Sequence, residues 1–356
     1  MPYTQSKNKR APLSRKDRNA LRLLLSASPD AGKTAITSNE VSASPEYDLQ
    51  IVLPVYNAAQ YLAECIDSVL PQLYGKYKAQ LVIVDDGSTD NSPKIISQYA
   101  SLPGVHVISQ ENKGFSEARN AALREINAKY VFFLDSDDIL APRAVQLLLD
   151  EAEGMGADIV EGGHTYFGVA GRQAVVRRPE HYRGTDWLRL NGTPWAKVYR
   201  ASLFKGLRFP PGYWFEDSLG PLLLFPLCRT VSQIPNEVYR YRANPDGISH
   251  RSHGSTRNID ALWVSHSLLS DARRLKHDFS PALLQAFLRD TRCSLNRLSA
   301  VPDRKIQDAA FRTVCCLCQT YFPGVSTEGL RDRLLLLTLR TRQRTLYRML
   351  RRLHVI

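Results

Sequence analysis

The sequence predicts an α/β fold with a mostly parallel sheet flanked by helices, followed by a C-terminal helical appendage. Between residues 49 and 160, short apolar runs alternate with helical patterns, which is typical of βαβ units. The apolar runs are continuous, as expected for strands that are covered by helices on both faces. Beyond about residue 257, helical periodicity continues to the last residue with few turn signals.

The first half of this fold consists of alternating strands and helices. The expected strands are 49–54, 81–85, 105–108 and 130–134, and the expected helices are 58–73, one ending near 99, 114–126 and 141–152. Parallel strands place their carboxyl ends at one edge of a sheet, so the polar loops after the four strands should converge there. The second half is less regular, with a strand near 159–161, a hairpin at 166–176 around Gly171, short strands at 195–199 and 238–241, and an apolar helix at 219–227.

Composition limits the class of protein. The 356 residues are 44% hydrophobic and 23% charged, which is ordinary for a soluble globular protein. The net charge of +12 indicates an anionic partner. We expect neither a transmembrane helix nor a signal peptide, and the six cysteines form no paired framework, so a reducing cytoplasmic location is expected. A zinc site at Cys315 and Cys318 is disfavoured because Cys316 interrupts the spacing.

The last stretch of the chain is rich in arginine. Residues 331–353 contain eight arginines and a leucine stripe at three-, four- and seven-residue spacing, made of Leu335, Leu339, Leu346, Leu350 and Leu353. This pattern is typical of a helix that lies on an anionic membrane surface. A docked helix with a solvated basic face is an alternative. A nucleic-acid patch is disfavoured because no aromatic-interleaved groove or known binding module accompanies the charge.

Acidic residues follow the strand at 130–134. Asp135, Asp137 and Asp138 lie within four positions, and carboxylates so close repel one another unless a cation neutralises them. A divalent metal is the simplest explanation. The alternative is that Ser136 and Asp138 belong to a turn that caps the next helix, with the other acids solvated.

Three further side chains are expected at the same edge. Tyr56 can stack on a planar base or complete the edge of the core. Asp86 can accept a hydrogen bond from the imide N–H of uracil or bond its own turn. Arg119 lies near the start of a helix whose dipole favours anions. Together these residues suit a base, a diphosphate and a metal.

Residues 49 to about 138 resemble the inverting family 2 glycosyltransferases of the GT-A fold. The resemblance depends on four motifs in the family's order, namely Val52-Leu53-Pro54-Val55-Tyr56-Asn57, Val84-Asp85-Asp86-Gly87-Ser88-Thr89-Asp90, Asn112-Lys113-Gly114 with Ser116 and Ala118-Arg119-Asn120, and Leu134-Asp135-Ser136-Asp137-Asp138. It continues more weakly to about residue 250. The resemblance implies a catalytic domain at 47–256. Residues 1–46 are polar and show no sustained period, so we expect a flexible basic tail with one short helix near 18–25, and the helical periodicity predicts a helical region at 257–356. Within the catalytic domain, residues 47–140 would bind the nucleotide and 141–256 the acceptor.

The resemblance also implies roles for individual residues. Donor-binding residues would be Pro54, Val55, Tyr56, Asp86, Lys113, Gly114, Arg119, Asp135 and Ser136. Asp137 would bind Mn²⁺ or Mg²⁺, and His250 is a candidate further ligand, although a histidine after a glycine turn is more often a surface residue. Glu216 and Asp217 match the family's acid pair, with Asp217 as general base.

The implied function is metal-dependent, inverting sugar transfer. A nucleotide-sugar donor, with UDP favoured, would react with a hydroxyl of a glycan or lipid-linked acceptor during cell-surface polysaccharide synthesis, and the enzyme would lie peripherally on the cytoplasmic face of the membrane. One alternative is an aspartyl phosphatase-like hydrolase, in which the strand before Asp-x-Asp comes first in the core. The other is an inactive module that binds nucleotide sugars without turnover.

Overall fold

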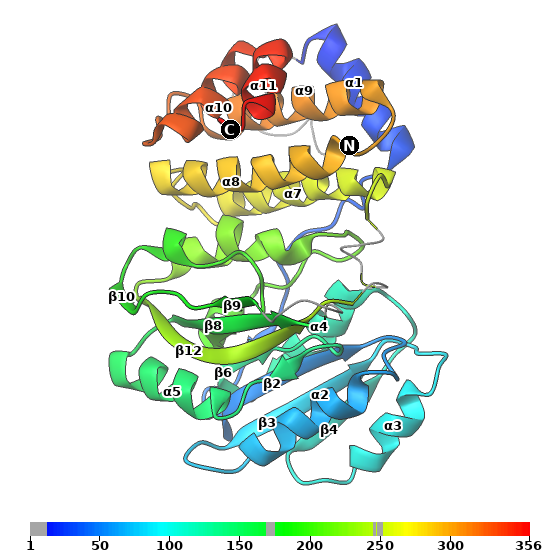
Figure 1. The fold of residues 1–356 in the computed structure, drawn as a ribbon, viewed down its shortest axis with the longest axis vertical. Helices are drawn as coiled ribbons and strands as arrows, with labels where there is room; N and C mark the ends of the chain where they lie inside the picture. The colour runs from blue at the N-terminus through cyan, green and yellow to red at the C-terminus, as the bar shows by residue number, and fades with distance from the viewer. Residues whose placement is uncertain (1–12, 169–174, 245–246, 248–251) are drawn as a thin grey trace. The chain divides into compact units, whose positions relative to one another are not determined.

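The structure is a computed structural model that describes residues 13–168, 175–244, 247 and 252–356. Its elements belong to two compact units (Figure 1). The sheet unit comprises residues 35–212 and 227–245, and the helical unit comprises residues 1–34, 213–226 and 246–356.

A mixed sheet forms the centre of the sheet unit. Its strand order is β10-β12-β8-β11-β6-β2-β3-β4, with β7 paired to β12 and β9 paired to β8. The strands are β2 Tyr47–Val55, β3 Ala79–Asp85, β4 Val105–Ser109, β6 Ala128–Phe133, β7 Ile139–Leu140, β8 Ile159–Phe167, β9 Val175–Arg177, β10 Tyr182–Gly184, β11 Lys197–Arg200 and β12 Val231–Arg242. A small separate sheet pairs β1 Glu40–Val41 with β5 Glu125–Ile126.

The predicted fold class is confirmed, and its parallel part is the one that the sequence indicated. Strands β6, β2, β3 and β4 are neighbours and run parallel, which brings their carboxyl ends to one edge. Strand β11 lies antiparallel between β6 and β8, so the sheet as a whole is mixed.

Helices cover both faces of the parallel strands. They are α2 Leu62–Val69, α3 Ser92–Tyr99, α4 Phe115–Leu123 and α5 Ala144–Met155, with short 3-10 turns at η1 Leu70–Gln72, η2 Trp187–Arg189 and η3 Ala201–Phe204. Leu49, Ile51 and Leu53 of β2 share one buried cluster with side chains of α2, α3 and α5. On the other face, Gln50 donates a hydrogen bond of 2.7 Å to a carbonyl of α4. This double coverage explains the continuous apolar runs.

The second half of the sheet unit contains the predicted hairpin strands. β8 and β9 pair antiparallel, with Tyr166 opposite Val175, and the expected turn around Gly171 lies outside the described residues. The predicted helix at 219–227 is wrong in type: three short 3-10 and π segments occupy the region, η4 Glu216–Ser218, η5 Gly220–Leu224 and η6 Phe225–Leu227. Pro226 lies inside the predicted helix and lacks the N–H that an α-helix would bond to the Leu222 carbonyl.

The helical unit is helical throughout its described C-terminal part, as predicted. Its elements are α1 Arg15–Ala27, η7 Thr256–Ile259, α7 Asp260–Arg274, α8 Pro281–Leu298, α9 Arg304–Tyr321, α10 Leu330–Thr341 and α11 Arg344–Arg352. Ser280 and Asp303 cap α8 and α9 through their side chains. Helix α1 lies within the segment expected to be a flexible tail, and it packs on α9, with Asp17 bonded to Arg342 at 2.6 Å.

The predicted single helix at 331–353 is wrong. Helix α10 ends at Thr341, and Arg342 adopts a left-handed conformation with φ of 55° before α11 begins. Leu335 and Leu339 of the leucine stripe are fully buried within the helical unit, and Leu350 is nearly so. These contacts favour the docking interpretation for most of the stripe. Every helix in the described part of the chain is too short or too polar to cross a bilayer.

Candidate active site

The loops after β2 and β3 are hydrogen-bonded to each other, as the convergence of the strand ends predicts. The Asn57 side-chain oxygen accepts from the Thr89 amide at 2.7 Å, and the Asn57 amide donates to the Ser88 hydroxyl at 3.1 Å. Pro54 and Val55 lie within β2 itself. Tyr56 follows them and is 50% exposed, which leaves its ring accessible at this edge.

Asp86 organises the loop that precedes α4. Its carboxylate accepts hydrogen bonds from the amides of Lys113 at 2.9 Å and Gly114 at 2.8 Å, and from the Gln110 side chain at 2.7 Å. Gly114 has φ of 86°, so the turn into α4 requires a glycine there. A carboxylate offers about four lone-pair directions, and these bonds use three of them.

Arg119 holds the first acid of the Asp-x-Asp motif. Its guanidinium donates to Asp135 at 2.7 Å and lies beside the rings of Phe115 and Phe209, at 5.6 and 5.4 Å from their centroids. The Arg119 side chain is only 7% exposed. The observed contact of this arginine is therefore with Asp135, which it orients.

Asp138 supports the turn formed by residues 135–138, which we call the acidic turn. It is buried, and its carboxylate accepts from the Tyr239 hydroxyl at 2.6 Å and from the Arg242 amide at 2.7 Å. The same hydroxyl accepts a bond from the Asp135 amide at 3.2 Å. Burial, together with the charges of Asp135 and Asp137, raises the pKa of Asp138 well above its usual range.

Asp137 differs from Asp138 because it is only partly buried. One of its carboxylate oxygens accepts from the Asn244 side chain at 2.8 Å, and its carbonyl accepts from Arg242 at 2.8 Å. Burial first, and then the charge of Asp135, raises the pKa of Asp137. An oxygen-rich turn in which carboxylates oppose one another's ionisation fits a divalent cation. His250, the expected further ligand, lies outside the described residues.

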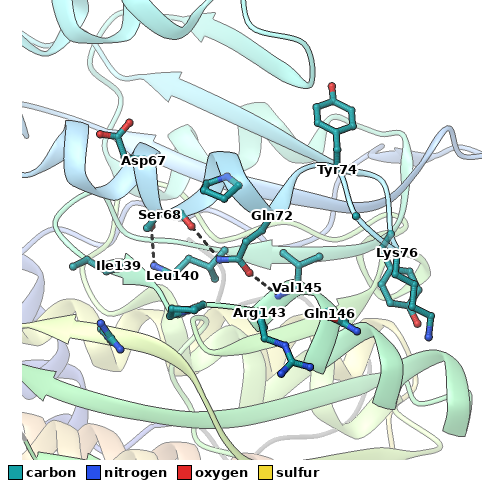
Figure 2. Close-up of a pocket in the computed structure, with 15 residues that line it drawn as sticks. Asp67, Ser68, Gln72, Tyr74, Lys76, Ile139, Leu140, Arg143, Val145 and Gln146 are labelled. Atoms are coloured by element: carbon teal, nitrogen blue, oxygen red, sulfur yellow. Dashed lines mark hydrogen bonds between the residues drawn. The ribbon is translucent and has the colours of Figure 1, made fainter.

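Figure 2 shows how the chain after the acidic turn is held to α2 and η1. Ser68 accepts from the Leu140 amide at 3.1 Å, and Gln72 accepts from the Val145 amide at 3.2 Å. The four bonded residues also line a cavity of about 460 Å³, together with Arg143 and other residues. Asp135, Asp137 and Asp138 do not line this cavity, so the acidic residues are not part of it.

The second acid pair belongs to the helical unit. Glu216 and Asp217 lie in η4, directly after Phe215, whose φ of 66° gives the sharp bend. Glu216 is 4% exposed, whereas Asp217 is partly exposed. Asp217 is therefore the more accessible acid of this pair.

Comparison with known proteins decides the family. Residues 50–210, which include all four motifs, match the model of glycosyl transferase family 2. GlyG, a glycosyltransferase of Streptococcus pneumoniae serotype 4, is 26% identical over 286 residues, which cover 74% of this chain and 94% of GlyG. Residues 50–210 form a glycosyltransferase domain of family 2. The expectation from the motifs is confirmed, and the phosphatase-like alternative is set aside.

Another relative is named for a role in teichoic acid biosynthesis. GgaB, a minor teichoic acid biosynthesis protein of Bacillus subtilis, is 26% identical over 239 residues, which cover 64% of this chain and 26% of GgaB. Two further relatives are covered over 31% and 62% of their own length. The chain thus spans only part of the length of these relatives.

Solved structures confirm the GT-A fold. S. aureus TarS 1–349 in complex with UDP-GlcNAc has a TM-score of 0.67 and 21% identity, with 85% of this chain and 89% of TarS covered. The mannosyltransferase PcManGT from Pyrobaculum calidifontis, in complex with GDP-Man and Mn²⁺, has a TM-score of 0.51 and 17% identity, with 96% of this chain and 94% of PcManGT covered.

Some supports of the family 2 site were missed from the sequence. Tyr239 reads as an ordinary strand residue, and nothing local indicates that its hydroxyl reaches an acidic turn about 100 residues earlier. Asn244 and Gln110 were missed for the same reason. Arg242 supports the same turn, because its amide donates to the Asp138 carboxylate and its guanidinium donates to the Asp137 carbonyl.

Proposed function

We propose that this protein transfers a sugar from a UDP-sugar to a hydroxyl of a glycan or lipid-linked acceptor, with inversion, in a divalent-metal-dependent reaction. The observation that carries the proposal is the acidic turn at the carboxyl edge of β6. There Asp138 is buried and bonded to the Tyr239 hydroxyl, Asp135 is ion-paired with Arg119, and Asp137 is partly exposed. The UDP-GlcNAc complex of TarS and the teichoic acid role of GgaB support this class of donor and acceptor.

The donor would occupy the loops after β2 and β3. Asp86 keeps one lone-pair direction for an imide N–H, and the exposed ring of Tyr56 offers a stacking surface for the base. The diphosphate would lie toward Lys113, Gly114 and the start of α4, because the amides and dipole at a helix N-terminus favour anions. Ser116 supports this placement, since its hydroxyl is buried and has no hydrogen-bond partner among the described residues.

Asp137 would hold Mn²⁺ or Mg²⁺, with Asp135 and Ser136 on the donor side. No group of three ligating side chains occurs within the described residues, and Mg²⁺ is usually held by one or two carboxylates together with phosphate oxygens. When bound, the metal would neutralise charge that develops on the leaving diphosphate. The Mn²⁺ in the PcManGT complex supports this assignment. His250 is retained as a candidate ligand.

Asp217 would act as general base, with the buried Glu216 beside it. In that step the acceptor hydroxyl gives its proton to the Asp217 carboxylate, and the acceptor oxygen forms a bond to the anomeric carbon. The bond from that carbon to the diphosphate breaks, and the nucleoside diphosphate leaves with the electron pair. A single displacement of this kind inverts the anomeric configuration.

A donor screen tests the proposal directly. The purified chain is incubated with Mn²⁺ and a panel of UDP- and GDP-sugars, and release of nucleoside diphosphate is measured with and without a chelator. We expect turnover of a UDP-sugar that stops when the metal is removed, and Asp217→Asn should lower kcat about 10²- to 10⁴-fold. Metal-dependent binding of UDP without turnover of any donor would instead identify an inactive nucleotide-sugar-binding module.

Peripheral membrane contact is proposed in a narrower form than the sequence indicated. Leu330, Leu337, Met349 and Leu353 are exposed among the arginines of α10 and α11. Apolar side chains with flanking arginines suit an anionic bilayer surface. We expect the chain to cosediment with vesicles containing anionic lipid, and less so after Leu330→Ser and Leu353→Ser together. Equal sedimentation of the double variant would reject this surface.

A further inference from the structure

The segment that carries Asp217 contacts several other elements of the helical unit. The Trp214 amide donates to the Asp260 carboxylate of α7 at 3.0 Å, and the Arg297 guanidinium of α8 lies 4.2 Å from the centroid of the Phe215 ring. The Tyr213 hydroxyl, two residues before Phe215, donates a hydrogen bond to the carboxylate of Asp30. The chain leading into the bend at Phe215 is thus held by helices α7 and α8 and by the segment after α1.

Asp290 of α8 connects the segment after Asp217 to α7. One of its carboxylate oxygens accepts from the Ser218 hydroxyl at 2.7 Å, and the other accepts from the Ser265 hydroxyl of α7 at 2.6 Å. Ser218 directly follows Asp217 and is buried. A single carboxylate therefore joins η4, α7 and α8, and the residue it holds is the neighbour of the proposed base.

We propose that Asp290 is a positioning residue for the reaction: through Ser218 it fixes the main chain at Asp217. This inference rests on the proposed role of Asp217 as general base. A base must lie within hydrogen-bond reach of the proton it takes, and a displacement of about 1 Å can cost about 100-fold in rate.

The charges around Asp290 indicate a second effect on the base. Burial raises the pKa of Asp290, the two serine hydroxyls oppose this, the charge of Asp217 adds to it and Arg297 opposes it. The charge of Asp217 acts on the carboxyl from η4, Arg297 and Cys293 come from α8 itself, and α7 contributes the neutral Ser265. Since the interaction between two carboxylates is mutual, removing the charge at position 290 should favour the ionised form of Asp217.

Three variants separate the two effects, assayed with the nucleotide sugar that the donor screen identifies. Ser218→Ala and Asp290→Ala remove the bond to the turn and should lower kcat about 10- to 100-fold with the donor KM unchanged. Asp290→Asn can still bond both serines, because a hydroxyl can rotate to donate or accept. It should lose less activity than Asp290→Ala and move the acidic limb of the pH profile of kcat/KM to lower pH.

Asp332→Asn is the matched control. Asp332 is a buried acid of the same unit that pairs with Arg292 of α8. This variant should lower the thermal midpoint without changing the pH profile or kcat. If it lowers kcat as much as Asp290→Ala does, the effect is general loosening and the inference is wrong.

The two proposals fail in different ways. If Asp217→Asn retains full turnover, the base is assigned wrongly and the inference falls with it. If Asp217→Asn is inactive while Ser218→Ala and Asp290→Ala keep kcat within twofold, the base stands and Asp290 is not a positioning residue. Should Asp290→Ala not fold, Ser218→Ala decides alone, because it removes only one hydroxyl.

Discussion

Replacing Tyr239 by Phe removes one hydroxyl that supports the acidic turn at two points. The hydroxyl donates to the Asp138 carboxylate at 2.6 Å and accepts from the Asp135 amide at 3.2 Å, and the Tyr239 side chain is fully buried. Its ring also stacks on Trp195 at 4.9 Å between centroids, a contact that Phe preserves. The variant therefore isolates the hydroxyl from the packing of the ring.

The expected cost follows from the two lost bonds. A buried acceptor left without its donor costs about 1–3 kcal/mol, and the bond to the Asp135 amide adds about 0.5–1.5 kcal/mol. Together these give about 1.5–4.5 kcal/mol, which corresponds to a fall in the thermal midpoint of about 3–18 °C for a domain of this size. Because the turn carries Asp135 and Asp137, we also expect kcat to fall about 10-fold or more.

Calorimetry of the full chain and donor turnover provide the two readouts. Tyr99→Phe is the control, since it removes a phenol bond of 3.0 Å to the exposed carboxylate of Asp67. Exposed contacts of this kind contribute little, so its midpoint should stay within about 2 °C of the parent protein. Equal midpoints and equal turnover in Tyr239→Phe and Tyr99→Phe would refute the view that this hydroxyl supports the turn.

Two further predictions concern charged side chains of the sheet unit. Arg119→Lys keeps the charge beside Asp135 but loses the planar contact with two aromatic rings, so kcat/KM should fall about 10-fold; unchanged steady-state kinetics would contradict the orienting role. The hydrogen bond from Arg183 lowers the pKa of Glu151 from 4.5 to about 2, so its contribution to stability is present above pH 4.5 and is lost as the pH falls toward 2. Glu151→Gln should therefore show a shallower fall of the thermal midpoint between pH 5 and 2 than the parent protein, and parallel curves would exclude this contribution.

The carboxyl edge of the sheet could be predicted because its signals are local. Each parallel strand is a continuous apolar run, and each of the four runs ends in polar residues, so βαβ topology alone brings the loops together. The bonds between Asn57 and the loop at 88–89 confirm that convergence. The motif residues extend this expectation to a family, which the match over residues 50–210 confirms.

The supports of the site depend on contacts between distant parts of the chain, which a sequence pattern does not encode. Arg119 was expected among the donor-binding residues, but its ion pair with Asp135 was not indicated by the sequence. The break between α10 and α11 has no glycine or proline to mark it, because Arg342 itself adopts the left-handed conformation. The acid pair at 216–217 reads as part of an α/β domain, but its packing partners are α7 and α8.

Calorimetric titration of UDP in the presence and absence of Mn²⁺ tests the central claim most directly, with the parent protein compared with Asp137→Asn. We expect Mn²⁺ to strengthen UDP binding to the parent protein by about 10-fold or more, and this gain to disappear in Asp137→Asn while the thermal midpoint is retained. The same Mn²⁺-dependent gain in both proteins would contradict the assignment of Asp137 as the metal ligand of a nucleotide-sugar site.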